Sequence, residues 1–484
     1  MTDQTRISLS TAFISFGAVY LLIAGFARSA VLNDPDTFWH IRVGEWILAN
    51  RQFPVTDVYS YTAFGNRWIA TDWLSEIALA TVFKFGRWWA VTETIALASG
   101  FIAAVLCFYL TRTLRLSVAL GTTVIIIALI SPHFLARPVM FSYCLLSLWI
   151  VIILEIEDRA LWTRWSAFVL VPLMLLWANI HASYMFGLVA FYIFALFALY
   201  RAFSMRESTN LYRIALLIGA VSAVTFATPY GLAALLRNIE LMRIPALGEI
   251  VEWRTPDFRN DKLHLVSIVG IFAVLVYFGI KLQGPRLLTL LLVTIFGLEH
   301  VRGLGVFGLV APLIVARPLS EQVTFLRAQG TKQDPLARVA HGRCALIAVC
   351  CTALVFATSL GFRSKRSQIR PPISIAPEGA ISAARQAGLS GNVLNSHSFG
   401  GYLIFLGIPT FVDGRVELYG NRFLGRYFDV MSLANLDDAS PFLKEYDIRW
   451  ALLKPDEPIV KLLISKGWVK LYHDGYSVVL ANKP

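Results

Sequence analysis

The chain has 484 residues, of which 57% are hydrophobic and 15% are charged, with a mean hydropathy of +0.62. This composition excludes a soluble globular protein with an ordinary polar surface and indicates a membrane protein with many spans. The net charge of +12 does not indicate nucleic-acid binding, because much of the arginine and lysine lies in short segments between apolar runs.

The apolar runs predict eleven membrane spans, given that about 20 residues cross the hydrocarbon core. They lie near residues 10–32, 91–111, 117–136, 139–156, 165–180, 183–200, 211–229, 263–281, 286–299, 303–316 and 344–362. The run 287–316 could be one long helix or two helices broken at residues 299–303. Basic residues favour two helices. Two helices here give eleven spans in total, and eleven spans with a cytoplasmic N-terminus place most short basic loops inside.

This topology predicts two domains: a transmembrane domain at 1–362, with outer loops 33–90 and 229–262, and an outer soluble domain at 363–484. Within the first loop, residues 74–89 are typical of a helix lying on the membrane surface. The tail is expected to be a small α/β domain. Its predicted helices are 377–387, 441–446 and 457–466, and its predicted strands are 392–395, 410–413, 450–453, 469–473 and 476–480.

An acidic motif follows the first span directly. Asp34 and Asp36 are separated only by a proline, His40 follows them, and Asp72 and Glu76 occur later in the same loop. Carboxylates beside a bilayer are costly, so their presence favours a functional site. The alternative is structural, in which the Asp pair caps a helix that begins near residue 37.

Further polar residues gather at the predicted outer ends of the spans. They are Arg137, Asn179, His181, Tyr230, Glu252, Glu299, His300 and Arg302. Carboxylates can act as bases or metal ligands, and arginine with histidine can hold an anionic group. The structural alternatives are an interfacial arginine at 137 and a satisfied histidine in a tight turn at 181.

These motifs resemble those of the GT-C superfamily of membrane glycosyltransferases, and the whole length is similar to a bacterial branch of it. The resemblance rests on the Asp-Pro-Asp motif with Trp39 and His40, and on the tail segments 399–403 and 411–415. It implies a GT-C-like bundle of about eleven transmembrane helices with a C-terminal soluble α/β domain. It also implies a place in the bacterial inner membrane with a periplasmic tail, and a polyprenyl-phosphate-linked sugar donor.

The resemblance implies a catalytic role for Asp36, with Asp34 and His40 beside it. Asp34 and Asp36 are the expected ligands of any Mg²⁺ or Mn²⁺. The residues expected to bind the donor phosphate are Arg137, Arg302 and His300. Those expected to bind or support the acceptor are Asp72, Glu76, Asn179, His181, Tyr230 and Glu252. The acceptor could be a glycan, a lipid or a protein.

Two other functions remain open. A transporter or flippase for a lipid-linked or anionic solute could use residues 299–302 as a coupling site, although no duplicated half is evident in the sequence. A polysaccharide polymerase or ligase would share the donor and the topology but transfer whole glycans.

Overall fold

The computed structural model describes residues 3–162, 164–241, 251–328, 343–361 and 368–482. These residues form two compact units. The first is drawn from residues 1–28, 92–231 and 248–367, and the second from residues 29–91, 232–247 and 368–484. The loop 33–90 belongs with the tail in the second unit.

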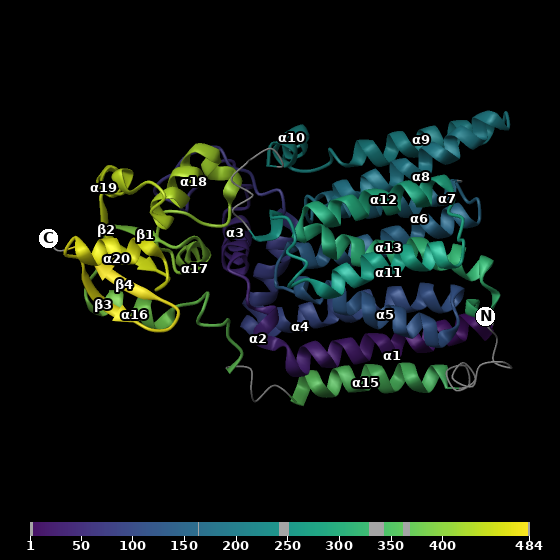
Figure 1. Cartoon of the computed structure of the whole chain (residues 1–484), viewed down its shortest axis with the longest axis horizontal. Coiled ribbons are helices and arrows are strands. Elements are labelled where there is room, and N and C mark those ends of the chain that lie inside the picture. Colours follow the sequence, from purple (N-terminus) through teal and green to yellow (C-terminus); the bar gives the residue numbers. More distant parts are fainter. Residues whose placement is uncertain (1–2, 163, 242–250, 329–342, 362–367, 483–484) are drawn as a thin grey trace. The chain divides into compact units, whose positions relative to one another are not determined.

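The described part of the first unit is helical (Figure 1). Its longer helices are α1 (Asp3–Phe26), the second part of α4 (Trp73–Thr113), α5 (Leu116–Ile130), α6 (Pro138–Asp158), α7 (Arg164–Ala178), α8 (Tyr184–Ser204), α9 (Ser208–Val224), α11 (Lys262–Tyr277), α12 (Gly284–Glu299), α13 (Val301–Gln322) and α15 (Cys344–Gly361). Single 3-10 turns are η1 (Ser131–His133), η3 (Val251–Trp253) and η4 (Thr324–Leu326).

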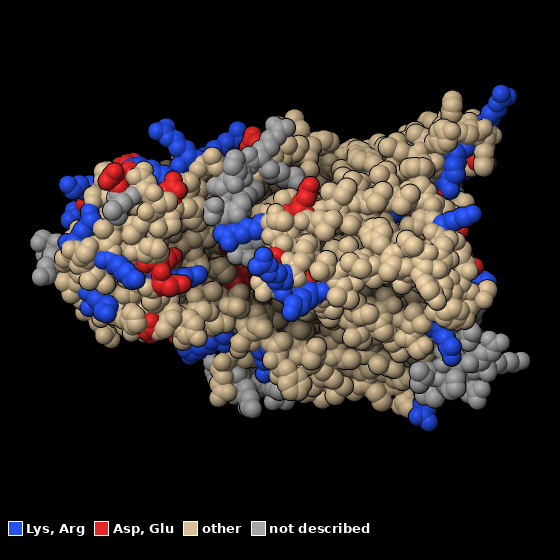
Figure 2. All heavy atoms as spheres, viewed as in Figure 1, with Lys and Arg blue, Asp and Glu red and all other residues tan. Residues whose placement is uncertain are grey.

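Among the described residues, six helices are long and apolar enough to cross a membrane, and three shorter helices are also apolar. Figure 2 shows that few charged side chains lie along the middle of these helices on the face in view, whereas Lys and Arg gather near their ends. A charge-free middle is what the hydrocarbon core requires. The membrane class predicted from composition is therefore confirmed, and the number of eleven spans stays a prediction.

The ambiguous run 287–316 forms two helices. Helix α12 ends at Glu299, His300 is extended with φ −136° and ψ 134°, and α13 begins at Val301. The helices pack closely at their joined ends, because a Cβ atom on Gly303 would overlap the carbonyl oxygen of Phe296. The break predicted from the charged residues 299–302 is confirmed.

The second unit combines a small sheet with helices. Its helices are α3 (Asp36–Asn50), the first part of α4, α10 (Leu232–Leu241), α16 (Glu378–Gln386), α17 (Gly400–Phe405), α18 (Val416–Ser432), α19 (Leu436–Glu445) and α20 (Pro458–Ser465), with the 3-10 turn η6 (His397–Phe399). The sheet has the order β1 (Asn392–Asn395), β2 (Ile448–Leu453), β4 (Val478–Ala481) and β3 (Val469–His473). Strands β1 and β2 are parallel, and the other two pairs are antiparallel. The expected α/β tail is thus confirmed. Helices α2 (Arg28–Val31) and α4 each begin in one unit and end in the other.

The predicted strand at 410–413 is wrong. Thr410 makes only an isolated bridge, with Ser60 of the loop 33–90. The amide of Asn395 binds the segment instead: its Oδ1 accepts the backbone N–H of Phe411 at 2.8 Å, and its Nδ2 donates to the carbonyl of Val412 at 2.8 Å. These bonds satisfy the backbone without a neighbouring strand.

The predicted surface helix 74–89 is the first part of α4. This helix continues through a single non-helical residue, Arg87, with φ 53° and ψ −149°. A bulky residue at positive φ is uncommon and marks a kink here.

Apolar side chains join the loop 33–90 to the tail. Phe38 of α3 lies in the core of the tail with Leu403 and Leu452. Trp39 and Trp68 form a second cluster with Ile404 and Leu418. These clusters hold the start of α3, which carries the acidic motif, against the tail.

Candidate functional site

The two carboxylates of the acidic motif have different surroundings at the start of α3. Asp34 is buried, and its Oδ1 accepts the backbone N–H of Asp36 at 2.8 Å. This bond satisfies one of the N–H groups that a helix leaves without a partner at its start. Asp36 is half-buried, and its Oδ1 accepts the indole N–H of Trp39 at 2.9 Å. Asp36 is therefore both accessible and oriented, whereas Asp34 supports the helix start.

His40 forms a buried pair with Glu76. Nδ1 of His40 lies 3.1 Å from Oε1 of Glu76, and the two side chains are 6% and 1% exposed. The pair links α3 to α4, and its burial favours support of α3 over contact with a substrate. Asp72 lies partly buried just before α4, where its carbonyl accepts the N–H of Glu76 at 3.1 Å.

The tail approaches the acidic motif through two glycines. A Cβ atom on Gly414 would overlap Oδ1 of Asp36, and one on Gly401 would overlap the carbonyl oxygen of Pro35. Both glycines belong to the tail segments that carry the family resemblance. In the structure these segments lie directly against Asp36 and Pro35, a placement that the motifs alone do not predict.

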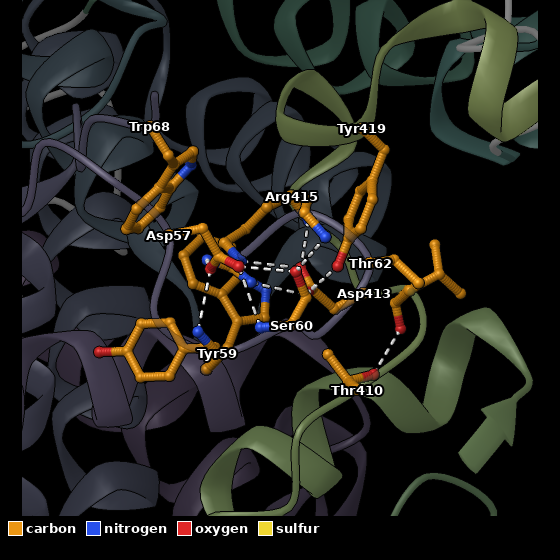
Figure 3. A network of polar contacts seen from close by, with 12 residues as sticks. Asp57, Tyr59, Ser60, Thr62, Trp68, Thr410, Asp413, Arg415 and Tyr419 are labelled. Atoms are coloured by element: carbon orange, nitrogen blue, oxygen red, sulfur yellow. Dashed lines mark hydrogen bonds and ion pairs between the residues drawn. The ribbon is translucent and has the colours of Figure 1, made fainter. Parts of the chain in front are cut away.

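A sealed charge cluster lies beside this contact (Figure 3). Arg415 donates from Nε and Nη2 to the two oxygens of Asp413, at 2.8 and 2.7 Å, and from Nη1 to Oδ1 of Asp57, at 2.5 Å. All three side chains are 0% exposed. Tyr419 donates to Oδ2 of Asp413 at 2.6 Å, and the guanidinium lies 4.8 Å from the ring centre of Trp68.

Both the acidic and the basic partners of this cluster have shifted pKa values, as Asp413 and Arg415 show. Burial alone would raise the pKa of Asp413, but the charge and hydrogen bonds of Arg415 outweigh it and hold that pKa below its ordinary value. Burial would likewise lower the pKa of Arg415, but the pairing with Asp413 raises it. Asp413 and Arg415 therefore stay ionised at neutral pH.

In the first unit, Arg137, Glu252 and Arg302 form a second cluster. Arg137 Nη2 pairs with Oε1 of Glu252, and Arg302 Nη2 lies 3.4 Å from its Oε2. The arginine side chains are 10% and 21% exposed, and that of Glu252 is 27% exposed. Burial alone would raise the pKa of Glu252, but the charges of Arg137 and Arg302 outweigh it and lower that pKa to about 2.

Local structure brings these three side chains together. Arg137 is extended because Pro138 follows it and begins α6. The turn η3 lies against the break between α12 and α13, where Nδ1 of His300 lies 2.9 Å from the carbonyl oxygen of Trp253. The guanidinium of Arg302 lies 5.3 Å from the ring centre of Trp253. Arg137 and Arg302, which are expected to bind the phosphate, thus pair with Glu252, which is expected to bind the acceptor. His300, also expected to bind the phosphate, contacts the turn η3.

The remaining predicted residues make local contacts. Asn179 is buried and donates to the carbonyls of Leu175, at 2.9 Å, and Ala227, at 3.1 Å, so it ties the end of α7 to the end of α9. His181 accepts the backbone N–H of Ser183 at 3.1 Å, and burial lowers its pKa well below the ordinary value. Tyr230 lies half-buried after α9. His181 therefore fits its structural alternative of a satisfied histidine in a turn, and Asn179 makes contacts that support the ends of two helices.

The expectation that Asp34 and Asp36 hold Mg²⁺ or Mn²⁺ stays a prediction. In the described part of the chain, no group of three or more His, Cys, Asp and Glu side chains lies close enough together to bind a metal ion. One oxygen of Asp34 and one of Asp36 accept N–H groups.

Solved structures show the same fold. Oligosaccharyltransferase AglB from Archaeoglobus fulgidus, in complex with an inhibitory peptide and a dolichol-phosphate, matches with a TM-score of 0.56 and 11% identity, over 92% of this chain and 69% of that chain. ArnT from Cupriavidus metallidurans, bound to undecaprenyl phosphate, matches with a TM-score of 0.50 and 13% identity, over 97% and 98%. Both are GT-C membrane glycosyltransferases. At such low identity the likeness shows the fold alone: this chain shares the fold of these two proteins. No protein-family model and no curated protein sequence matches the chain.

Proposed function

We propose that this chain with a GT-C fold transfers a sugar from a polyprenyl-phosphate-linked donor to an envelope glycan, lipid or protein, at the outer face of the bacterial inner membrane. The observation that carries the proposal is the half-buried Asp36 carboxylate, which Trp39 orients at the start of α3. The lipid phosphates bound to AglB and ArnT support the class of donor.

In the proposed reaction, Asp36 is the general base for the acceptor. It takes the proton of an acceptor hydroxyl or amine while the oxygen or nitrogen bonds to the anomeric carbon of the sugar. The bond from that carbon to the phosphate oxygen breaks in the same displacement, and the lipid phosphate leaves with the electron pair. One such displacement inverts the anomeric centre. Because phosphate is a good leaving group, no separate general acid is required.

Arg137 and Arg302 are the proposed partners of the donor phosphate. Their two positive charges face the single negative charge of Glu252, so the cluster has one positive charge in excess. Guanidinium groups bind phosphate oxygens with strong, charge-assisted hydrogen bonds. All three side chains remain partly exposed, which leaves the cluster open to an anion.

A metal at Asp34 and Asp36 is a separate question with a simple test. If Asp34 only supports the helix start, Asp34→Asn should reduce transfer less than Asp36→Asn does, and EDTA should have no effect. If the two carboxylates hold Mg²⁺ or Mn²⁺, both variants should be equally inactive and EDTA should abolish transfer.

The proposed location requires loop 33–90 and the tail to face outward. In a cysteine-free background, cysteines at Asn66 and Asn421 should react with a membrane-impermeant thiol reagent in intact spheroplasts. A cysteine at Met205, which is exposed between α8 and α9, should react only after lysis. Labelling at Met205 with protection at Asn421 would reverse the orientation.

Mass spectrometry of a deletion strain beside the wild type tests the function itself. We expect one class of envelope glycan, lipid or protein to lose a sugar, while the polyprenyl-phosphate sugar accumulates. Loss of a whole polymer would instead indicate a polymerase or ligase. Unchanged glycan transfer, with a lipid-linked solute retained on one side of the membrane, would indicate a transporter and contradict the proposal.

A further inference from the structure

We infer that the turn 413–415 of the tail positions Asp36, with Gly414 setting the place of its carboxylate and Arg415 holding the turn. This inference rests on the proposed role of Asp36 as the base. It assigns a function to a tail segment that makes no chemical contribution of its own.

The need for glycine at 414 is one of space. A Cβ atom there would overlap Oδ1 of Asp36 and come within 3.1 Å of Nε1 of Trp39. Gly414 has no positive φ, so its backbone conformation would accept other residues. What it provides is close approach: the backbone of the turn lies directly against the oxygen that the indole N–H also contacts.

This contact restricts how the carboxylate can turn. Oδ1 of Asp36 lies between the N–H of Trp39, at 2.9 Å, and the backbone of Gly414. Fixing one oxygen of a planar carboxylate on two sides fixes the direction of the other. A base held in one direction avoids the entropy cost of being aligned with the acceptor during the reaction.

Gly401 makes a similar close contact with Pro35, the residue before Asp36. A Cβ atom on Gly401 would overlap the carbonyl oxygen of Pro35 and lie 3.4 Å from Cδ1 of Trp39. The tail therefore contacts both the backbone before Asp36 and the side chain that orients it.

Arg415 keeps the turn in place. It bonds with Asp413 on one side of Gly414 in the sequence, and with Asp57 of the loop 33–90. The loop is joined to the tail nearby by the bridge between Ser60 and Thr410, and Thr62 donates to the carbonyl of Phe411 at 2.6 Å. The turn is thus bonded to the same loop that presents Asp36.

The test is Gly414→Ala, with Gly425→Ala as the matched control. Gly425 lies in α18 of the same unit, with open space around the place of a Cβ atom. Transfer would be assayed on purified protein with lipid extract of the deletion strain as donor and its membranes as acceptor. We expect Gly414→Ala to lower kcat by about ten- to a hundredfold with little change in KM, the size expected for a misplaced catalytic group. Gly425→Ala should match the wild type.

A double-mutant cycle distinguishes positioning from general damage. In an Asp36→Asn background, Gly414→Ala should cost nothing further, because the group that it positions is gone. Full activity of Gly414→Ala, or an equal loss in both backgrounds, would overturn the inference while leaving Asp36 as the base. Undiminished transfer by Asp36→Asn would overturn the proposed function instead.

If Gly414→Ala does not fold, Arg415→Lys provides a second test. It keeps the buried charge but loses the two-pronged bond to Asp413. A lowered kcat with an unchanged KM would support the inference, and wild-type kcat would contradict it.

Discussion

Arginines and carboxylates cluster in both units, but in opposite ratios. In the second unit one arginine, Arg415, lies between two carboxylates, Asp57 and Asp413, and all three side chains are 0% exposed. The guanidinium of Arg415 donates from Nε, Nη1 and Nη2, and each of these bonds goes to a carboxylate of the same cluster. A cluster that is sealed and has an excess of negative charge can hold two segments together but cannot receive an anionic ligand.

In the first unit one carboxylate, Glu252, lies between two arginines, Arg137 and Arg302. The side chains are between 10% and 27% exposed. Here positive charge is in excess and water reaches the cluster. The comparison shows that the ratio of charges and their exposure, more than the residue types, separate a structural cluster from one suited to a phosphate.

The largest expected effect is on stability, from Arg415→Met. This change leaves two buried carboxylates without their cation and should destabilise the second unit by about 3–5 kcal/mol. Thermal unfolding in detergent and the rate of tail proteolysis would measure the loss. The control is Arg449→Met, because Arg449 pairs with Asp447 while 61% exposed, and exposed pairs contribute about 1 kcal/mol or less.

Asp57→Asn sharpens the same point. It leaves Arg415 with Asp413, and should therefore cost less than Arg415→Met. Equal loss from both variants would show that the ratio of charges has no bearing on this cluster.

The next effect in size concerns the phosphate. Arg137→Ala and Arg302→Ala should each weaken binding of undecaprenyl phosphate by roughly one to two orders of magnitude, since a charge-assisted hydrogen bond contributes about 1.5–3 kcal/mol. Lysine at either position should restore binding only in part. Arg159→Ala is the control, because Arg159 directly follows α6, is half exposed and pairs with Glu155 one turn earlier. Wild-type affinity in both alanine variants would make these arginines structural.

A smaller effect of opposite sign is expected from Glu252→Gln. The substitution removes the internal anion that competes with phosphate for both arginines, so undecaprenyl phosphate should bind up to about tenfold more tightly, equivalent to about 1.4 kcal/mol. Glu321→Gln should have no effect, because Glu321 is exposed and pairs with Arg317 one turn earlier in α13. Weaker binding in Glu252→Gln would show that Glu252 orients the arginines for the phosphate and does not compete with it.

The smallest effect is a pH dependence. The pKa of Glu252 is lowered from 4.5 to about 2 by the two arginines, despite burial. A depressed carboxylate pKa contributes stability that is fully present above the unfolded value and is lost as pH falls through the folded value. The difference in Tm between wild type and Glu252→Gln should therefore be constant from pH 5 to 8 and shrink from about pH 4.5 to about pH 2. A difference that changes between pH 6 and 8 would contradict this pairing.

The sequence alone predicts the features that depend on neighbouring residues in the chain. Apolar runs indicated a membrane protein, and three charged or polar residues at 299–302 predicted the break that His300 makes between α12 and α13. The tail was recognisable as α/β because its strands are short apolar runs bounded by turn residues. Its one wrong strand, at 410–413, has strand-like composition, but the distant side chain of Asn395 takes its hydrogen bonds.

The sequence was insufficient where partners lie far apart. Arg415 and Asp57 are 358 positions apart, and His40 and Glu76 are 36 apart, so no periodicity joins them. The segment 411–415 is one of the motifs that carry the family resemblance, and the available signal for its cluster is an arginine between acidic and apolar residues in the tail. Nothing in one sequence could tell that Gly414 leaves room for Asp36, because close approach is a property of the packed chain.

The most direct test of the central claim is transfer by Asp36→Asn beside Glu45→Gln. Both positions lie on α3, and Glu45 pairs at the surface with Arg42, so its substitution controls for changes to the helix. Asparagine keeps the shape of aspartate but cannot take the proton. Asp36→Asn should insert and fold as the wild type does, while turnover falls by about two to four orders of magnitude and Glu45→Gln remains fully active. A folded Asp36→Asn protein that transfers sugar at the wild-type rate would contradict the account.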